Sequence, residues 1–363
     1  MTNDTSIASG VSARSSRRWS YDVLRVISIV GVVAIHTFAG MVSNPDLQGS
    51  ARWWYATAMD IGFIWVVPVF VMLSGALLLA PRQHAEGPAS FYRRRLLRLA
   101  PAFVFWQIFY IVVVFGWISG QTLTVAGVAT SILDGRTYTH LYFLWLIVGL
   151  YAVAPVLAAF LSDGGQKRAL LFAGALLAVA VATWSASSLL GYAGHPRPLT
   201  LLAFTQWLPY AGYFVAGWAL RDLRPRGAKL AAATVLTAAV IALLVWQYGT
   251  RPAHPLLDAL APISYLGPLV ALAAVGVFVS GNGLLSAFVP GRRIGAALRE
   301  LSDASFGVFL MHFVILILLR QAPPFAGALD SPVMVTLLWI ATVVISFGAT
   351  ILLRRVPVVR RVL

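Results

Sequence analysis

Ten apolar runs, each long enough to cross a lipid bilayer, follow one another along almost the whole chain. A helix rises about 1.5 Å per residue and the hydrocarbon core is about 30 Å thick, so roughly 20 residues span it. Inside the bilayer every backbone polar group must be hydrogen-bonded internally, which a helix achieves within one segment. The sequence therefore predicts an all-α, polytopic membrane protein with about ten transmembrane helices. The runs are 23–42, 56–79, 99–119, 141–160, 168–188, 204–220, 229–247, 262–279, 304–320 and 332–353.

The composition also indicates a membrane protein. Of the 363 residues, 60% are hydrophobic and 11% are charged, whereas a soluble domain averages about 25% charged residues. The net charge of +15 does not indicate nucleic acid, because arginine that flanks membrane spans produces the same total. The chain has no cysteine, which excludes disulfides and thiolate chemistry. We expect membrane lipids as partners, no nucleic acid and no metal.

The basic residues indicate how the chain is oriented. With the N-terminus in the cytoplasm, 22 of the 27 Lys and Arg residues fall on the cytoplasmic side of the predicted spans. Cytoplasmic loops carry such an excess in membrane proteins. We therefore predict a multi-pass protein of the inner (cytoplasmic) membrane with both termini cytoplasmic. The five basic residues on the outer side are Arg52, Arg136, Arg197, Arg251 and Arg320.

The chain divides into one large membrane domain and two short ends. Residues 1–19 are polar and Ser-rich and are predicted to be a disordered cytoplasmic N-terminus. The apolar run that follows is too long for the core of a signal peptide, so we interpret it as a retained first span. Residues 20–356 form the membrane domain, and 357–363 form a short basic cytoplasmic tail. The apolar segment 121–133 is expected to be a short re-entrant or interfacial piece.

The first span carries an arginine and a histidine on one face. The eleven residues from Arg25 to His36 turn a helix by about 1100°, roughly 20° past three turns, and cover about 16 Å. Asp22 lies three residues before Arg25, on nearly the same stripe. Arg25 alone could be a snorkelling flank residue, and His36 alone could be a core histidine bonded to a carbonyl. Ionisable groups inside spans are costly and usually functional. The shared face of Arg25 and His36 therefore favours a functional role for both, along a path that runs from the cytosol into the membrane.

Two other ionisable residues lie within the predicted spans. Asp60 lies as far inside the outer end of the second span as His36 does in the first. If the two faces match, its carboxylate could orient the imidazole and favour the protonated form; the alternative is that Asp60 faces outer-leaflet water. His312, in the ninth span, could be a second acid/base group or a packed core histidine. Ser74 and Gly75 are interpreted as helix-packing residues rather than a nucleophile site.

A basic cluster, "FYRRRLLRLAP" at 91–101, precedes the third span. Arg94 and Arg95 lie four and three residues before Arg98, so these side chains share a helix face. Guanidinium groups at such a position suit phosphate oxygens. The functional interpretation is a cytosolic phosphate-bearing cofactor, and the alternative is plain positive flanking or anionic-lipid binding.

An aromatic segment, "THLYFLWLIVGLYAVAP" at 139–155, begins the fourth span from the outside. His140, Tyr142 and Trp145 could belong to an aromatic belt at the membrane surface. They could equally line an outer pocket, because aromatic faces stack well on sugars. The residues alone leave both interpretations open.

The order of these motifs resembles the integral-membrane acyltransferase-3 family along nearly the whole chain. Arg25 and His36, with ten residues between them, resemble its Arg-x10-His signature. "VPVFVMLSG" (67–75), the Arg-rich entry to the third span and "HLYFLWLIVGLYAVAP" resemble its next motifs, although a Trp usually stands at the place of Tyr142. "SFGVFLMH" (305–312) is similar to a late Tyr-Leu-x-His element, with Phe309 in place of Tyr. The residues of these motifs resemble most the branch of surface-polysaccharide O-acetyltransferases.

The resemblance implies transfer of an acyl group, commonly acetyl, from acyl-CoA to a hydroxyl of a glycan or a glycosylated small molecule. It implies that His36 is the essential histidine, as general base or acyl carrier, and that Arg25 is its partner, with Asp60 a candidate to orient the ring. Acetyl-CoA is expected as a co-substrate rather than a permanently bound cofactor, with its phosphates at Arg94, Arg95 and Arg98. The residues expected to bind the acceptor are His140, Tyr142, Trp145 and His312. Many relatives carry a soluble hydrolase-like domain; without one, transfer is expected to finish inside the bundle.

Two other function classes remain open from the residues. A small-metabolite transporter could use the same buried Arg and His as substrate or proton sites, although the chain shows no internal repeat. A structural partner in an envelope complex would tolerate loss of Arg25.

Overall fold

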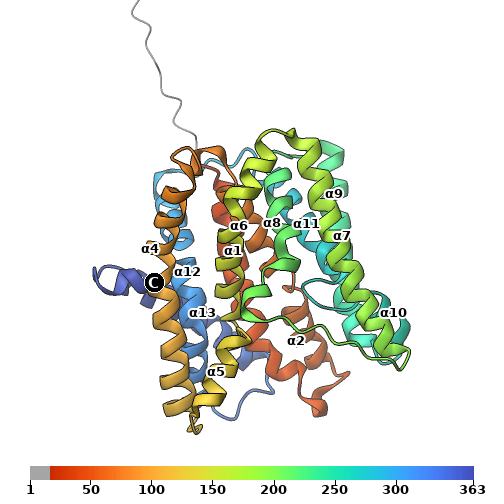
Figure 1. Ribbon diagram of the computed structural model, residues 1–363. Coiled ribbons are helices and arrows are strands. Elements are labelled where there is room, and N and C mark those ends of the chain that lie inside the picture. Colours follow the sequence, from red (N-terminus) through yellow and green to blue (C-terminus); the bar gives the residue numbers. More distant parts are fainter. Residues whose placement is uncertain (1–16) are drawn as a thin grey trace, which may run out of the picture.

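The computed structural model describes residues 17–363 and shows a bundle of helices (Figure 1). Residues 1–16, most of the predicted disordered N-terminus, lie outside the described residues, and the first helix begins at Trp19. No strand occurs among residues 17–363, which confirms the all-α class. The α-helices are α1 (Trp19–Val42), α2 (Ala51–Ile61), α3 (Val66–Leu78), α4 (Gly87–Phe109), α5 (Val125–Leu133), α6 (Tyr142–Ser162), α7 (Gly165–Tyr192), α8 (Ala211–Ala219), α9 (Gly227–Thr250), α10 (Pro255–Leu260), α11 (Pro268–Leu284), α12 (Arg292–Gln321) and α13 (Pro332–Leu353).

Eight helices in the described chain, counting α2 with α3 and α4 with its π-helical extension η3 (Tyr110–Ile118), are long and apolar enough to cross a membrane. The two other predicted spans, 204–220 and 262–279, correspond to shorter helices. Of these, α11 has 17 residues and α8 has nine, the latter preceded by the 3-10 turn η5 (Leu208–Tyr210). Pro209 and Pro268 interrupt helical hydrogen bonding at these starts. Every residue of α8 is buried, so protein rather than lipid surrounds this short helix, as a non-spanning segment at membrane depth requires.

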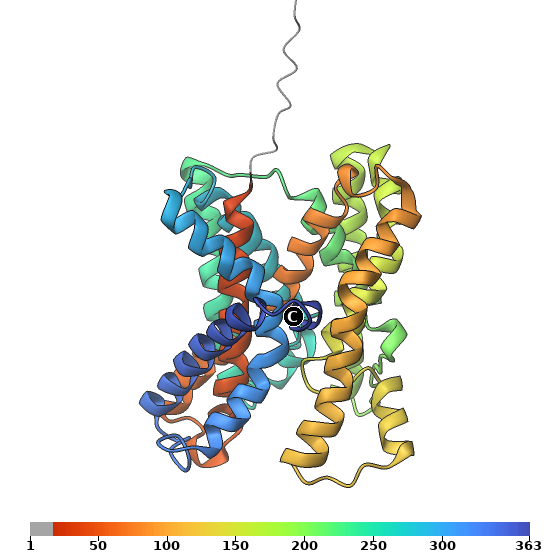
Figure 2. The same ribbon diagram turned by 90° about the vertical axis from the view of Figure 1, so that its left-hand side faces the viewer.

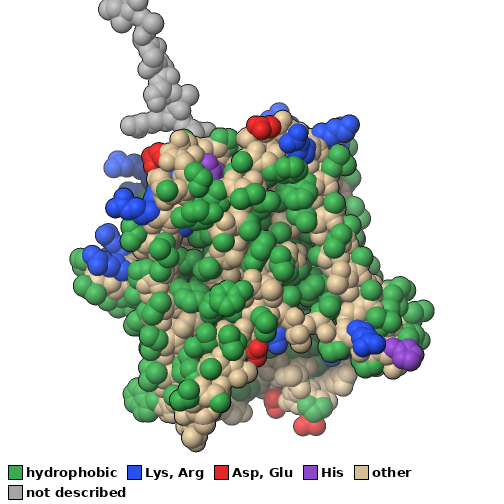
Figure 3. Space-filling model, in the orientation of Figure 1, with side chains coloured by type: hydrophobic (Ala, Val, Ile, Leu, Met, Phe, Trp, Pro, Cys, Tyr) green, Lys and Arg blue, Asp and Glu red, His purple; other side chains and the backbone are tan. Residues whose placement is uncertain are grey.

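The outer surface of the bundle is largely apolar. Figure 3 shows hydrophobic side chains over the flank of the molecule, with Lys and Arg gathered mainly at its top and upper left edge. Trp117 and Val125 are 81% and 90% exposed, which suits contact with lipid tails or the interface rather than water. The chain is therefore a multi-pass membrane protein.

Two groups of helices face each other across the centre of the bundle. In Figure 2, α4 and α5 stand apart from α12 and α13, and the C-terminal end of the chain lies between them. There η6 (Val359–Val362) packs on α4, and the Trp106 Nε1–H donates to the Val362 carbonyl at 2.7 Å. The predicted tail, 357–363, thus includes a segment that packs against the bundle.

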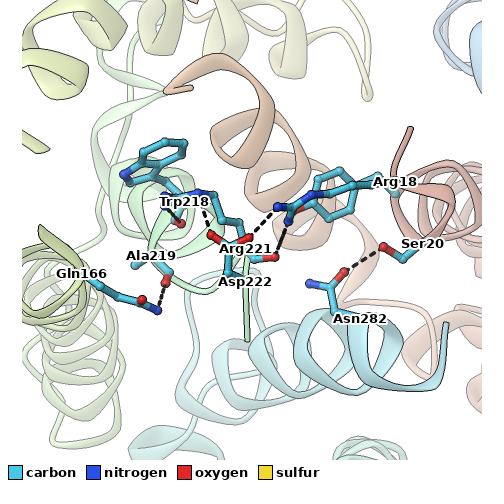
Figure 4. A network of polar contacts seen from close by, with 9 residues as sticks. Arg18, Ser20, Gln166, Trp218, Ala219, Arg221, Asp222 and Asn282 are labelled. Atoms are coloured by element: carbon cyan, nitrogen blue, oxygen red, sulfur yellow. Dashed lines mark hydrogen bonds and ion pairs between the residues drawn. The ribbon is translucent and has the colours of Figure 1, made fainter. Parts of the chain in front are cut away.

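Hydrogen bonds tie the start of α1 to the turn after α8 and to the last turn of α11 (Figure 4). The Arg18 guanidinium donates to the Asp222 carboxylate at 2.5 Å and to the Arg221 carbonyl at 2.6 Å. Ser20 Oγ donates to Asn282 Oδ1 at 3.0 Å. Partial burial raises the pKa of Asp222, but the hydrogen bonds and charge of Arg18 outweigh it, so the net pKa is lowered. The carboxylate is therefore ionised at neutral pH, and the pair holds α1 in register.

Helices α3 and α8 cross so closely that each requires a glycine. A Cβ at Gly75 would lie 1.8 Å from the Phe214 carbonyl oxygen, and a Cβ at Gly217 would lie 1.8 Å from the Met72 carbonyl oxygen. Small residues permit such approaches between helices in membranes. The packing interpretation of Gly75 is thereby confirmed.

Replacing Gly75 by alanine is expected to destabilise the bundle by about 1–3 kcal/mol, because the methyl group would push α3 away from the α8 backbone. The measurement is the melting temperature of the purified protein in detergent. Gly174→Ala in α7 is the matched control, since nothing lies within 4 Å of its Cβ position and alanine favours a helix interior. Equal melting temperatures for Gly75→Ala and wild type would contradict the close crossing.

Candidate active site

A cavity of about 610 Å³, here called the central cavity, lies between α1, α3, α4, α6 and α12. Arg25 and His36 both line it, as their spacing on one helix face predicts. Arg25 marks the end near the starts of α1 and α4, at the top of Figure 1, and His36 lies about 16 Å deeper along α1. The other lining residues of the predicted site are Arg95, Arg98, His140 and Tyr142.

The shallow end of the central cavity is basic. Arg25 Nη1 donates to Ser302 Oγ at 3.2 Å, and Arg95 Nη2 donates to Gln83 Oε1 at 2.6 Å. The Arg95 Nε–H is buried without a partner, and Arg98 makes no hydrogen bond or ion pair with any residue from 17 to 363. Asp303 is the carboxylate in the wall. Three guanidinium groups thus converge with little compensation, which is an arrangement that attracts anions.

Arg94 does not belong to this wall. Its guanidinium is paired with the Glu86 carboxylate and donates to the Gln83 carbonyl at 3.0 Å. Hydrogen bonds from Ser90 and Arg94, and the charge of Arg94, lower the pKa of Glu86, so this partner is ionised. The one-helix-face argument failed here because a nearby acid in the preceding loop holds the side chain outside the cavity.

Three histidines meet at the deep end. The ring centroids of His36 and His312 are 5.5 Å apart, and those of His140 and His312 are 5.0 Å apart. His36 and His140 line the central cavity, whereas His312 is fully buried behind them. Phe313 closes the cluster, with its ring 4.4 Å from that of His36. In the described chain, no group of three or more His, Cys, Asp or Glu is placed to hold a metal ion.

His140 reaches this depth because the chain before α6 runs into the bundle. Thr137 and His140 are 0% and 2% exposed, and Tyr110 from η3 packs its ring 4.9 Å from His140. Tyr110 Oη also donates to the Leu310 carbonyl at 2.9 Å, which joins η3 to α12. Periodicity in the sequence did not reveal this inward path, and both interpretations of His140 placed it nearer the surface.

Arg320 is a residue of the deep end to which the sequence analysis gave no role. Its Nη2 donates to the carbonyl oxygens of His36 and Thr37, at 3.0 and 3.1 Å. The guanidinium therefore holds the backbone of α1 at the level of the deep end. The positive-inside count had placed Arg320 among the outer basic residues without a role.

Two further predicted site residues, Asp60 and Trp145, lie outside the wall of the central cavity. Asp60 does not line the central cavity, and among residues 17–363 it forms no hydrogen bond or ion pair with His36; its electrostatic contact is with Tyr265. Equal depth in neighbouring helices does not decide which way a side chain points. Trp145 packs against Phe103 and Phe204, outside the cavity wall, with centroid distances of 4.8 and 5.6 Å.

Tyr142, in contrast, lies in the wall of the deep end with Tyr265. Its hydroxyl is buried beside the hydroxyls of Tyr210 and Tyr265. Buried polar groups are rarely left unpaired. Together with the two lining histidines, this hydroxyl gives the deep end several groups able to bind or transfer protons beside an apolar wall, as small-molecule sites commonly have.

The chain matches the family model of the acyltransferase-3 domain, described as an acyltransferase domain, over residues 18–355. No curated protein and no solved structure matches it. The matched region contains every α-helix from α1 to α13. The chain therefore belongs to the acyltransferase-3 family of membrane acyltransferases.

Proposed function

We propose that the protein transfers an acyl group, specifically acetyl, from acyl-CoA to a hydroxyl of a glycan or glycosylated small molecule. The observation that carries this is the central cavity, which joins Arg25, Arg95 and Arg98 at one end to His36 at the other. A family of acyltransferases needs a donor site and a proton-transfer site within reach of each other, and one cavity supplies both.

The donor is proposed to bind with its phosphates at the basic end. Arg95 and Arg98 offer guanidinium forks suited to phosphate oxygens. The wall between the two ends is mainly apolar, with Val67, Phe70 and Leu77 from α3, which suits a thioester arm that must lose water to reach the deep end. In this proposal the basic end faces the cytosol across the inner membrane, where acyl-CoA is available.

His36 is proposed to carry the chemistry. As general base it takes the proton of the acceptor hydroxyl while the oxygen attacks the thioester carbonyl, and the C–S bond then breaks. The proton passes from His36 to the departing sulfur, which leaves as CoA thiol. As acyl carrier, His36 first attacks the thioester carbonyl, so that an N–C bond forms, the C–S bond breaks and CoA leaves as thiolate; the acceptor oxygen then takes the acyl group as the N–C bond breaks, and the acceptor's proton passes to the thiolate. His140 and Tyr142, in the same wall, are proposed to hold the acceptor.

The test uses the purified protein in lipid nanodiscs with acetyl-CoA. Because the chain has no cysteine, a thiol-reactive dye reports released CoA without background from the protein. Release that depends on an added glycan extract is the expected result, and a transporter would release none. Mass spectrometry of surface glycans and secreted metabolites, comparing a deletion strain with its parent, then identifies the acceptor by its missing acyl group.

A further inference from the structure

The ring of His312 has a defined tautomer. Its Nδ1 lies 3.1 Å from the Val308 carbonyl oxygen and 2.8 Å from the Phe309 carbonyl oxygen. A carbonyl oxygen only accepts hydrogen bonds, so Nδ1 carries the hydrogen. In a neutral imidazole the other nitrogen then holds a lone pair. Nε2 of His312 is therefore an acceptor that needs a donor.

No donor among residues 17–363 satisfies that nitrogen. Nε2 of His312 is buried with no hydrogen-bond partner. A charged His312 would not solve this, because it would place an unpaired cation in the interior beside two other histidines and no carboxylate. The residue is thus a neutral imidazole with an unused lone pair inside the histidine cluster.

Two neighbouring rings carry an N–H that could be donated to this lone pair, His36 on α1 and His140 before α6. The His140 ring stands at 71° to that of His312, edge to face. The His36 ring is nearly parallel to it, at 25°, with centroids 5.5 Å apart. Two imidazoles joined edge to edge by an N–H···N bond have centroids about 5 Å apart. Catalytic hydrogen bonds are often long before substrate binds, and this bond requires a shift of His36 that brings one of its ring nitrogens into the plane of the His312 ring, opposite Nε2.

We propose that His312 is the positioning residue for His36, accepting a hydrogen bond from one ring nitrogen so that the other presents its lone pair to the central cavity. This deepens the proposed function and rests on it. A carboxylate usually has this task beside a catalytic histidine, but none contacts His36 within the described chain. A neutral imidazole orients the ring without placing a second charge in the membrane interior.

The proton balance is complete without any further group. When the acceptor hydroxyl attacks the thioester, its proton goes to the cavity-facing nitrogen of His36, which becomes an imidazolium. The new C–O bond forms, the C–S bond breaks, and the same proton passes to the thiolate sulfur of CoA. His312 keeps its own Nδ1 hydrogen throughout and accepts the N–H of His36 in both states.

The first test does not depend on activity. Protein labelled with ¹⁵N-histidine has six histidines, and a His312→Asn variant assigns the signals of His312 by their absence. The expected spectrum shows His312 protonated at Nδ1 and unprotonated at Nε2, with the Nε2 signal shifting in His36→Leu. A hydrogen on Nε2, or an Nε2 signal unchanged by His36→Leu, would overturn the proposal even if the protein proves to be an acyltransferase.

The second test compares three replacements of His312 in the CoA-release assay. Glutamine places a hydrogen-bond acceptor near the position of Nε2. Asparagine places its polar group near the position of Nδ1 only, and leucine places no polar group at either position. We expect His312→Leu and His312→Asn to lower kcat about 10- to 100-fold, as loss of a residue that orients a catalytic histidine does, with KM for acetyl-CoA unchanged. His312→Gln should recover most of the rate.

Equal losses in all three variants at unchanged melting temperature, or full activity in His312→Leu, would show that His312 is a packing residue only. If the leucine variant does not fold, the comparison of glutamine with asparagine and the tautomer measurement still decide. If wild-type protein releases no CoA, the proposed function fails, and the tautomer measurement alone tests the contact between the two histidines.

Discussion

Replacement of His36 by alanine is expected to reduce acyl transfer by about 10²- to 10⁴-fold, the range that a positioned acid/base group contributes. His36 is the histidine of α1 that lines the deep end of the central cavity, opposite the basic end that contains Arg25. Its loss leaves the donor site intact. The effect should therefore appear in kcat, with the KM for acetyl-CoA close to that of wild type.

The measurement is CoA release in nanodiscs with the variant and a matched control. His254→Ala is suited to the control, because His254 precedes α10 and contacts Trp246 outside the central cavity. Rapid quenching with radiolabelled acetyl-CoA then separates the two roles of His36: label on the wild-type protein indicates an acyl carrier, and its absence indicates a base. Wild-type activity in His36→Ala would refute both.

Removing the guanidinium groups of Arg95 and Arg98 together is expected to raise the KM for acetyl-CoA by about 10²- to 10⁴-fold, since each charge-assisted hydrogen bond to phosphate contributes about 1.5–3 kcal/mol. Arg98 has no partner within the described chain, and the Arg95 Nε–H is buried and unpaired. Neither substitution therefore breaks an ion pair of the fold, and we expect it to weaken binding of the acyl donor.

Acetyl-pantetheine makes this prediction specific, because it carries the thioester arm without the phosphates. The double variant Arg95→Ala, Arg98→Ala should use acetyl-pantetheine as well as wild type does. Arg93→Ala is the control on the same helix, since Arg93 is exposed and does not line the cavity. A similar loss with both donors, or a similar loss in the control, would show that the arginines support the fold or lipid binding instead.

Predictions that depend on spacing within one helix agree with the structure better than predictions that depend on contacts between helices or loops. The spacing of Arg25 and His36 is set within one helix, so helix geometry alone places both on one wall. The helical spacing of Arg95 and Arg98 likewise places both on the cavity wall, but it failed for Arg94, because the acid that holds Arg94 comes from the preceding loop. Matching depths suggested that Asp60 faces His36, yet depth carries no information about the direction of a side chain around its helix axis.

The sequence by itself determined that this chain is an all-α membrane protein, which helices are apolar, and that a basic cluster and a buried histidine belong to one family pattern. The first two follow from hydropathy and short-range periodicity, which act within single segments, and the third follows from the resemblance of the motifs to the family. Only the tertiary structure decided that His36, His140 and His312 form one cluster and that Arg320 holds the backbone at His36 from 284 positions away. Such contacts depend on how helices rotate and pack against one another, and no local pattern in the chain records that rotation.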